Sequence, residues 1–173
     1  MAAIKAIFFD LGDTIMQELT EVKDDTLTTQ SADLFPGMAA LLHTLKERGY
    51  KLGLVADTRP GTYRNVLNQH QLFDLFDVFA ISEELGVVKP HPLMFQHALA
   101  GVGLSDVEAS AALMVGNNLS RDVRGARALG IGTVWIRWND RYPTVPACGD
   151  EEPLHIVQSA DELIALINHL EER

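Results

Sequence analysis

Asp10 is the first residue in the chain whose type and position suit chemistry. It ends a continuous apolar run, Ile-Phe-Phe at positions 7–9, and is followed by the turn Leu-Gly-Asp-Thr. Such a continuous run of β-branched and aromatic residues is typical of a strand buried on both faces of a parallel sheet. Ligands of these sheets lie beyond the carboxyl ends of the strands, so a carboxylate here is placed to attack a bound electrophile. The simpler interpretation is a strand that closes in an acidic turn.

Three later stretches place further polar groups after or beside apolar runs. Lys89 lies in the sequence Val-Lys-Pro-His-Pro, where two prolines restrict the backbone and hold the lysine in a defined place. Its ammonium group could neutralise both a carboxylate and an anionic substrate. Carboxylates at the other loops could hold magnesium, which prefers oxygen ligands. The remaining candidates are Asp57 and Thr58 after the apolar stretch 50–56, and Asn117, Asn118 and Asp122 in the polar turn 116–122.

The apolar pattern predicts the elements that must position these groups. Short buried-type strands alternate with segments whose apolar residues recur at three- and four-residue spacing, which is typical of helices. This alternation predicts an α/β fold of three layers with a mainly parallel central sheet. Residues 16–34 are polar without a clear period, and we interpret them as a flap or short irregular insertion. In addition to the first strand, we expect strands at 50–56, 78–81, 112–115, 133–138 and 155–157. We expect helices at about 37–48, 62–70, 92–100, 123–129 and from Ser159 onward.

Composition limits the classes of function. The chain has 173 residues, 47% of them hydrophobic, which suits one domain over 1–173 with a sizeable core. Its formal net charge of −10 argues against general binding to nucleic acid or to anionic membranes, both of which need a basic surface. The single cysteine, Cys148, cannot form an internal disulfide, and no segment has the pattern of a signal peptide or a membrane span. We therefore expect a cytoplasmic protein.

The four polar stretches, in this order, resemble the motifs of the haloacid dehalogenase (HAD) superfamily. The resemblance covers nearly the whole chain, through FFDLGDT, LGLVADT, VVKPHPLMF and MVGNNLSRDVRGARALG. It implies a Rossmann-like core and, in the phosphatase members, a magnesium ion and an aspartate nucleophile. On this resemblance we assign Asp10 and Lys89 to catalysis. We assign phosphate binding to Asp57, Thr58, Lys89 and Asn118, and magnesium binding to Asp10, the carbonyl of Gly12, Asn117 and Asp122.

Three positions depart from the phosphatase pattern. The second aspartate of the first motif, which serves as general acid and base, is replaced by Gly12, and Asp13 lies one place too late. Ala56 stands where a phosphate-binding Ser or Thr is expected, and Asn117 stands where an acidic residue is expected. Loss of general acid and base catalysis lowers rates by about 10²–10⁴. One hypothesis is that Gly12→Asp would raise the phosphatase rate, provided that the side chain fits.

These departures leave three functions open. The first is a magnesium-dependent phosphatase of weak activity, acting on a phosphorylated small molecule or macromolecule. The second is a metal-independent 2-haloacid dehalogenase, because those members also lack the second aspartate. The third is a HAD-fold protein that binds a phosphate-bearing partner without turnover. The chain has no room for a large cap domain between its motifs, so the flap, a homo-oligomer partner or the substrate itself would have to cover the site.

Overall fold

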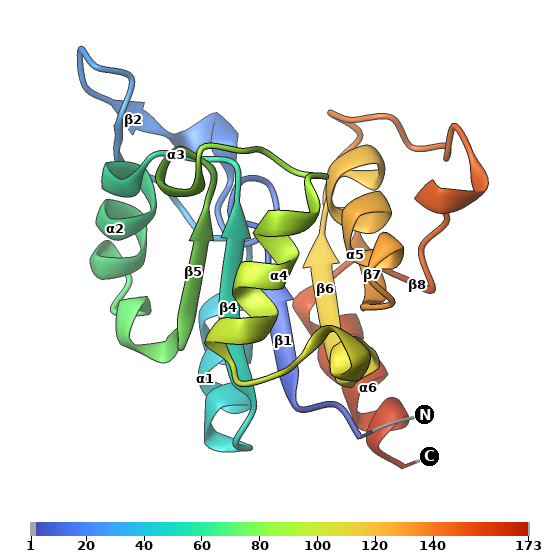
Figure 1. Cartoon of the computed structure of the whole chain (residues 1–173). Helices are drawn as coiled ribbons and strands as arrows, with labels where there is room; N and C mark the ends of the chain where they lie inside the picture. Colours follow the sequence, from blue (N-terminus) through green and yellow to red (C-terminus); the bar gives the residue numbers. More distant parts are fainter. Residues whose placement is uncertain (1–2, 173) are drawn as a thin grey trace.

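A six-stranded parallel sheet forms the centre of the fold. The computed structural model describes residues 3–172, and its sheet has the strand order β5-β4-β1-β6-β7-β8 with every neighbouring pair parallel (Figure 1). The chain builds outward from β1 to β4 and β5, then returns to place β6 on the other side of β1. This reversal puts β1 at the switch point of the sheet, where open α/β sheets bind ligands. The strands are β1 (Ala6–Phe9), β4 (Lys51–Ala56), β5 (Val78–Ile81), β6 (Ala112–Gly116), β7 (Gly132–Ile136) and β8 (His155–Val157).

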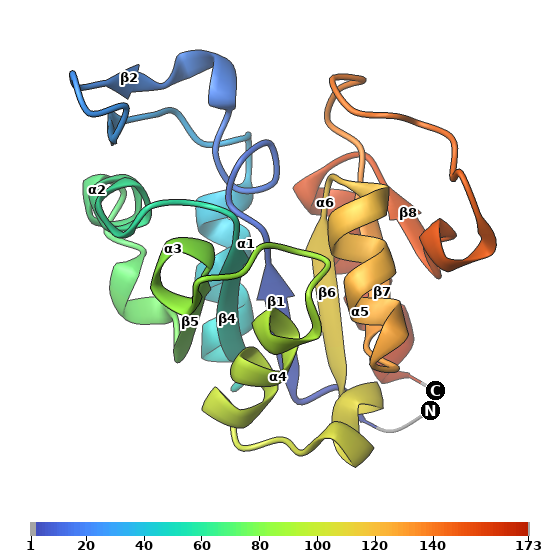
Figure 2. The same ribbon diagram turned by 45° about the horizontal axis from the view of Figure 1, so that its top comes forward.

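Helices cover both faces of the sheet. Strand β1 shows why two faces must be covered: Ile7 and Phe9 point into one hydrophobic core, and Ala6 and Phe8 point into the other. Helices α1, α2 and α6 pack on the first core and helices α4 and α5 on the second, as Figures 1 and 2 show. The helices are α1 (Met38–Glu47), α2 (Pro60–Gln69), α3 (Ser82–Leu85), α4 (Pro92–Gly101), α5 (Arg124–Ala128) and α6 (Ala160–Glu171).

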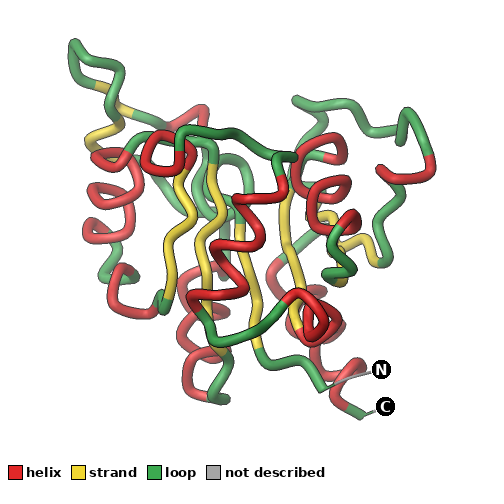
Figure 3. Tube along the Cα trace, viewed as in Figure 1, coloured by secondary structure: helices red, strands yellow, loops and turns green. Residues whose placement is uncertain are grey.

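The predicted architecture is confirmed. The three-layer α/β fold with a parallel sheet is present, and each predicted strand and helix has a counterpart within a few residues. The pattern missed the short helix α3 and the short helical segments at 18–20, 73–75, 106–111 and 149–151, which are too short to show a period. The long connection after β7 is mostly loop (Figure 3). No helix within residues 3–172 has the length and apolar character needed to span a bilayer.

The flap, residues 16–34, is a small hairpin rather than an irregular insertion. Strands β2 (Val22–Lys23) and β3 (Thr29–Ser31) pair antiparallel, and a bridge between Met16 and Leu34 joins the two ends of the flap. The sequence pattern did not reveal this hairpin, because strands of two and three residues are too short to show alternation. Because the two strands share few hydrogen bonds, the hairpin is also held by hydrogen bonds to α2. The Thr29 N–H donates to Thr62 Oγ1 at 3.1 Å, and Asn65 Nδ2 donates to the Thr29 carbonyl at 2.9 Å.

Candidate active site

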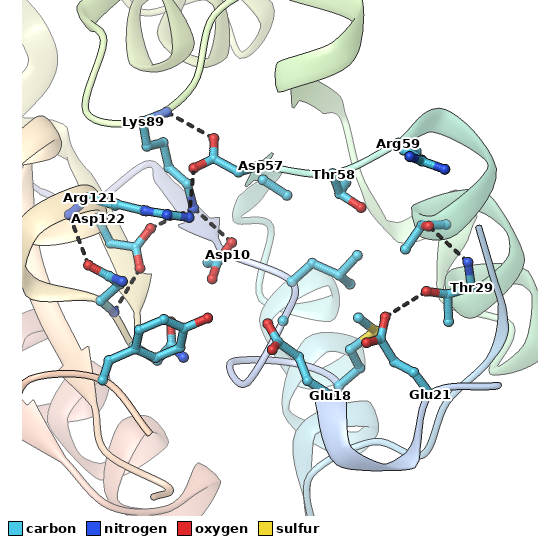
Figure 4. A pocket seen from close by; sticks show the side chains of 18 of the residues that line it. Asp10, Glu18, Glu21, Thr29, Asp57, Thr58, Arg59, Lys89, Arg121 and Asp122 are labelled. Carbon is cyan, nitrogen blue, oxygen red and sulfur yellow. Dashed lines mark hydrogen bonds and ion pairs between the residues drawn. The ribbon is translucent and has the colours of Figure 1, made fainter. Parts of the chain in front are cut away.

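Asp10 lies directly beyond the end of the central strand. Its backbone N–H donates to the Val115 carbonyl at 3.0 Å, which continues the pairing of β1 with β6 by one residue. Its side chain borders a cavity of about 320 Å³ at the carboxyl ends of the strands (Figure 4). The sheet itself therefore fixes the position of this carboxylate.

Lys89 joins Asp10 to Asp122. Its Nζ lies 2.7 Å from Asp10 Oδ1, 2.6 Å from Asp122 Oδ1 and 2.9 Å from the Val55 carbonyl, so all three ammonium protons have acceptors. The Lys89 side chain is 2% exposed, that of Asp122 1% and that of Asp10 13%. We call Asp10, Lys89 and Asp122 the floor of the site. It is a buried ion cluster drawn from three loops, and Asp10 is its most exposed member.

Asp122 is held by a tight turn after β6. This turn, Leu119–Val123, is a single π-helical turn, and the Asn118 N–H donates to Asp122 Oδ2 at 3.0 Å. Gly116 ends β6 against the Asp122 side chain, where a Cβ atom at position 116 would overlap the carboxyl group. The glycine is needed for this close approach. Both oxygens of Asp122 accept hydrogen bonds, so in this arrangement the residue anchors Lys89 and the turn.

Electrostatics within the floor favour a charged lysine. Burial alone lowers the pKa of Lys89, but the carboxylates of Asp10, Asp122 and Asp57 outweigh it and hold the pKa above its ordinary value. Burial raises the pKa of the Asp122 carboxyl, and the Asp10 charge adds to the rise, whereas Lys89 and the Asn118 N–H oppose it. A lysine shared by two carboxylates stays protonated at neutral pH, so a cation is present beside the Asp10 carboxylate.

The other residues predicted for the site gather around the same cavity. Asp57 Oδ1 accepts the backbone N–H of Lys89 at 2.8 Å, and Asp57 Oδ2 lies 3.5 Å from Arg121 Nη1. Asp57 therefore contacts both the loop of Lys89 and the turn that contains Arg121. Asn118 Oδ1 accepts the N–H groups of Ser120 and Arg121 at 3.1 Å and thus caps the turn that holds Asp122. Asp57 and Asn118 thus hold neighbouring loops in place. All the predicted residues line the cavity: Asp10, Gly12, Asp57, Thr58, Lys89, Asn117, Asn118 and Asp122.

Asp13 points away from the cavity, as its position in the sequence predicted. It is 2% exposed and has a left-handed backbone, with φ of 48°. Its Oδ1 accepts the backbone N–H of Glu18 at 3.0 Å, and its Oδ2 lies 2.7 Å from Arg141 Nη1. Asp13 is therefore a structural anchor that ties the loop after β7 to the start of the flap.

One wall of the cavity comes from the flap, and the sequence pattern did not predict it. Glu18, Glu21 and Thr29 lie across the cavity from Lys89 in Figure 4, and the Glu18 carboxylate points toward Asp10. Burial raises the pKa of Glu18, the charges of Asp13, Asp10 and Glu21 add to the rise, and Arg141 opposes it. No motif marks these residues, because polar residues in a loop show no periodicity. Only the fold of the hairpin places them here.

The donors at the site fit magnesium by chemical type. Magnesium prefers hard oxygen ligands and keeps several waters. The Asp10 carboxylate, the Gly12 backbone and the Asn117 side chain all border the cavity. Asn117 Nδ2 is buried without a hydrogen-bond partner among the described residues, so the protein scaffold does not hold this end of the amide. Residues 3–172 contain no group of three or more Asp, Glu, His or Cys side chains arranged as a metal site. Of the three donors Asp10, Gly12 and Asn117, only Asp10 carries a charge.

Comparison with known proteins identifies the family. A family model described as haloacid dehalogenase-like hydrolase matches residues 4–136. A glyceraldehyde 3-phosphate phosphatase from Pyrococcus abyssi is 38% identical over 103 residues, which are 60% of this chain and 42% of that protein. A phosphoserine phosphatase from Thermus thermophilus is also 38% identical over 103 residues, which are 60% of this chain and 40% of that protein. The chain thus spans about two fifths of the length of these curated relatives.

Solved structures share the fold. An HAD phosphatase from Thermococcus onnurineus superposes with a TM-score of 0.75 at 22% identity, over 95% of this chain and 98% of that one. The HAD-hydrolase YfnB from Bacillus subtilis, bound to magnesium, gives a TM-score of 0.77 at 17% identity, over 96% and 99%. A dehalogenase gives 0.79 at 18% identity, over 96% and 98%. Because the family model covers most of the chain and the motif residues converge on one cavity, this protein belongs to the haloacid dehalogenase-like hydrolases.

Proposed function

We propose that this protein is a magnesium-dependent phosphatase that hydrolyses phosphate monoesters through an aspartyl phosphate on Asp10. One observation carries the proposal. The Asp10 carboxylate lies at the end of the central strand, with one oxygen held by Lys89 at 2.7 Å, on the border of a cavity that can take a phosphate group. A carboxylate so fixed meets the geometric needs of a nucleophile.

The floor supplies the nucleophile and the stabilising cation for the first step. Asp10 attacks phosphorus, and the Lys89 ammonium group, already beside Asp10, stabilises negative charge that develops on the phosphoryl oxygens. Asp122 and Val55 hold that ammonium group in place from the buried side. Thr58 and Asn118 also border the cavity and would contact the phosphate.

Magnesium would be held by Asp10, the Gly12 carbonyl and Asn117, with Asp122 behind them. When bound, it would neutralise charge on the phosphate and help to orient it. The relatives that act on glyceraldehyde 3-phosphate and phosphoserine support a phosphorylated substrate and make small phosphate esters the first compounds to screen. We also propose that the protein acts in the cytoplasm, with no general affinity for nucleic acid or membranes, and that a homo-oligomer partner or a macromolecular substrate could cover the site.

The lining of the cavity favours a phosphatase over a dehalogenase. Charged and polar groups dominate it, including the cations Lys23, Arg59 and Arg121, whereas a carbon–halogen substrate needs an apolar pocket. The polar lining also fits the third function, binding of a phosphate-bearing partner without turnover. Activity therefore has to be measured.

The test compares hydrolysis of an aryl phosphate and of 2-chloropropionate by the purified protein, each with magnesium and with chelator, beside the Asp10→Asn variant. We expect magnesium-dependent phosphate release that falls at least about a thousandfold in Asp10→Asn, with an unchanged melting temperature. Chelator-resistant chloride release would establish the dehalogenase instead. Absence of both activities, with phosphate binding retained, would establish the non-catalytic function.

A further inference from the structure

The proposed reaction lacks an evident proton donor for the leaving group. Position 12, from which the family's acid would act, is a glycine, and Asp13 is occupied by Arg141 and the Glu18 backbone. An alkoxide is a poor leaving group, so an ester of an ordinary alcohol needs a proton as its P–O bond breaks. The donor must come from another part of the chain.

We propose that Glu18 of the flap is the general acid and base of this site, an inference that rests on the proposed phosphatase function. The carboxyl group of Glu18 fills the space beside Gly12. A Cβ atom built on Gly12 would overlap Glu18 Oε1 and would lie 3.0 Å from Cδ and 3.1 Å from Cγ of the same side chain. Glu18 therefore occupies the volume that a side chain at position 12 would enter, and it reaches that volume from the opposite wall.

The two oxygens of Glu18 have different surroundings. Oε2 lies 3.1 Å from Arg141 Nη2, and the Glu18 backbone is fixed by its bond to Asp13 Oδ1. Oε1 lies on the Gly12 side and makes no hydrogen bond within the described residues. One oxygen is thus held in place while the other remains available to a ligand. Figure 4 shows this carboxylate pointing across the cavity toward Asp10.

Glu21 shows that this placement is not shared by every acidic residue of the flap. Its Oε1 accepts a hydrogen bond from Thr29 Oγ1 at 2.6 Å, and its Oε2 lies 2.9 Å from Lys23 Nζ. Both of its oxygens are used within the flap. Glu21 also lies farther along the wall from Asp10 than Glu18 does in Figure 4. It therefore makes a matched control.

Glu18 gives up a proton in the first step of the reaction and regains one in the second. In the first, an Asp10 oxygen bonds to phosphorus, the bond from phosphorus to the ester oxygen breaks, and that oxygen takes the proton of the Glu18 carboxyl group as the alcohol leaves. In the second, water attacks the phosphorus of the aspartyl phosphate and gives a proton to the Glu18 carboxylate. The bond between phosphorus and Asp10 breaks, which restores both carboxyl groups to their starting forms and releases phosphate.

The test compares kcat/KM for two esters whose leaving groups differ in their need for a proton. The Glu18→Gln variant is compared with wild type on glycerol phosphate, whose alkoxide needs a proton, and on 2,4-dinitrophenyl phosphate, whose leaving group does not. We expect kcat/KM for glycerol phosphate to fall by about 10²–10⁴ and kcat/KM for the dinitrophenyl ester to fall by less than about tenfold. The control Glu21→Gln should change both substrates by the same factor. A loss in Glu18→Gln that is equal for both substrates, or no loss, would overturn the inference.

A second experiment moves the carboxylate. Because Glu18 fills the space beside Gly12, the single variant Gly12→Asp is expected to gain nothing, which replaces the hypothesis drawn from the sequence. The double variant Gly12→Asp, Glu18→Ala should recover glycerol phosphate hydrolysis at least about tenfold over Glu18→Ala. No recovery in a double variant with the wild-type melting temperature would count against Glu18. A wild type that hydrolyses neither ester would overturn the proposed function itself, whereas an active wild type with an unaffected Glu18→Gln would overturn only this inference.

Discussion

The floor and the flap form opposite sides of one cavity, and they are held in different ways. Each floor residue follows a strand end or lies in a loop packed against one, and bonds of 2.6–2.7 Å join the charged groups of the floor. The flap is a short hairpin with exposed apolar residues such as Leu27, attached to α2 by hydrogen bonds of its backbone. The sheet therefore fixes Asp10 and Lys89, while the flap can carry a different group without disturbing them.

The largest expected effect comes from removing the cation of the floor. Lys89→Met leaves the Asp10 and Asp122 carboxylates without the cation that joins them. Breaking a buried ion pair in this way costs about 3–5 kcal/mol in the free energy of unfolding, measured by urea denaturation. Phosphatase activity should be lost as well.

The double variant Lys89→Met, Asp122→Asn is the control for this prediction. It removes one of the two stranded charges, so it should regain part of the stability and none of the activity. Unchanged stability in Lys89→Met would mean that the floor does not depend on its ion cluster. It would contradict the statement that the floor and the flap are held in different ways.

A smaller effect is expected at the link between the flap and the loop after β7. Arg141→Leu removes the partner of Asp13 Oδ2, and leaving a buried acceptor unpaired costs about 1–3 kcal/mol. It also frees Glu18, so kcat for glycerol phosphate should fall several-fold while kcat for the dinitrophenyl ester changes less. Arg137→Leu, which breaks an exposed ion pair with Asp140 in the same loop, should change stability by no more than about 0.5 kcal/mol. Equal effects of the two variants would contradict the role of Arg141 in positioning Glu18.

The smallest effect is expected at the tip of the flap. Leu27 has a left-handed backbone with φ of 63° and is exposed. In Leu27→Gly, relief of strain opposes the entropy that glycine loses on folding, so stability should stay within about 1 kcal/mol of wild type. Val22→Gly in the neighbouring strand has no strain to relieve and should lose stability, measured by the same denaturation. The same loss in both variants would show that the tip carries no strain.

The floor was predictable from the sequence, and the flap wall was not. Strand ends of a parallel sheet meet at one edge, so the apolar runs before Asp10 and before the turn of Asp122 were enough to bring these residues together. Helix α1 was predictable for a similar local reason, since its buried residues recur at helical spacing. The contact of Glu18 with Gly12 depends on how a hairpin of two- and three-residue strands packs on α2. The pairing of Asp13 with Arg141 joins positions 128 residues apart, which no local pattern encodes.

The attachment of the flap to α2 has a consequence for the fate of the phosphoryl group. Thr29 is bonded to both Thr62 and Asn65, and Ala32 to Gln69, so three hydrogen bonds hold the flap against α2. A wall of this kind does not swing shut over an intermediate to exclude solvent. In the proposed reaction, water would reach the acyl phosphate as soon as the alcohol leaves, ahead of any second alcohol. The architecture thus commits the phosphoryl group to water, and suits a hydrolase better than a phosphotransferase.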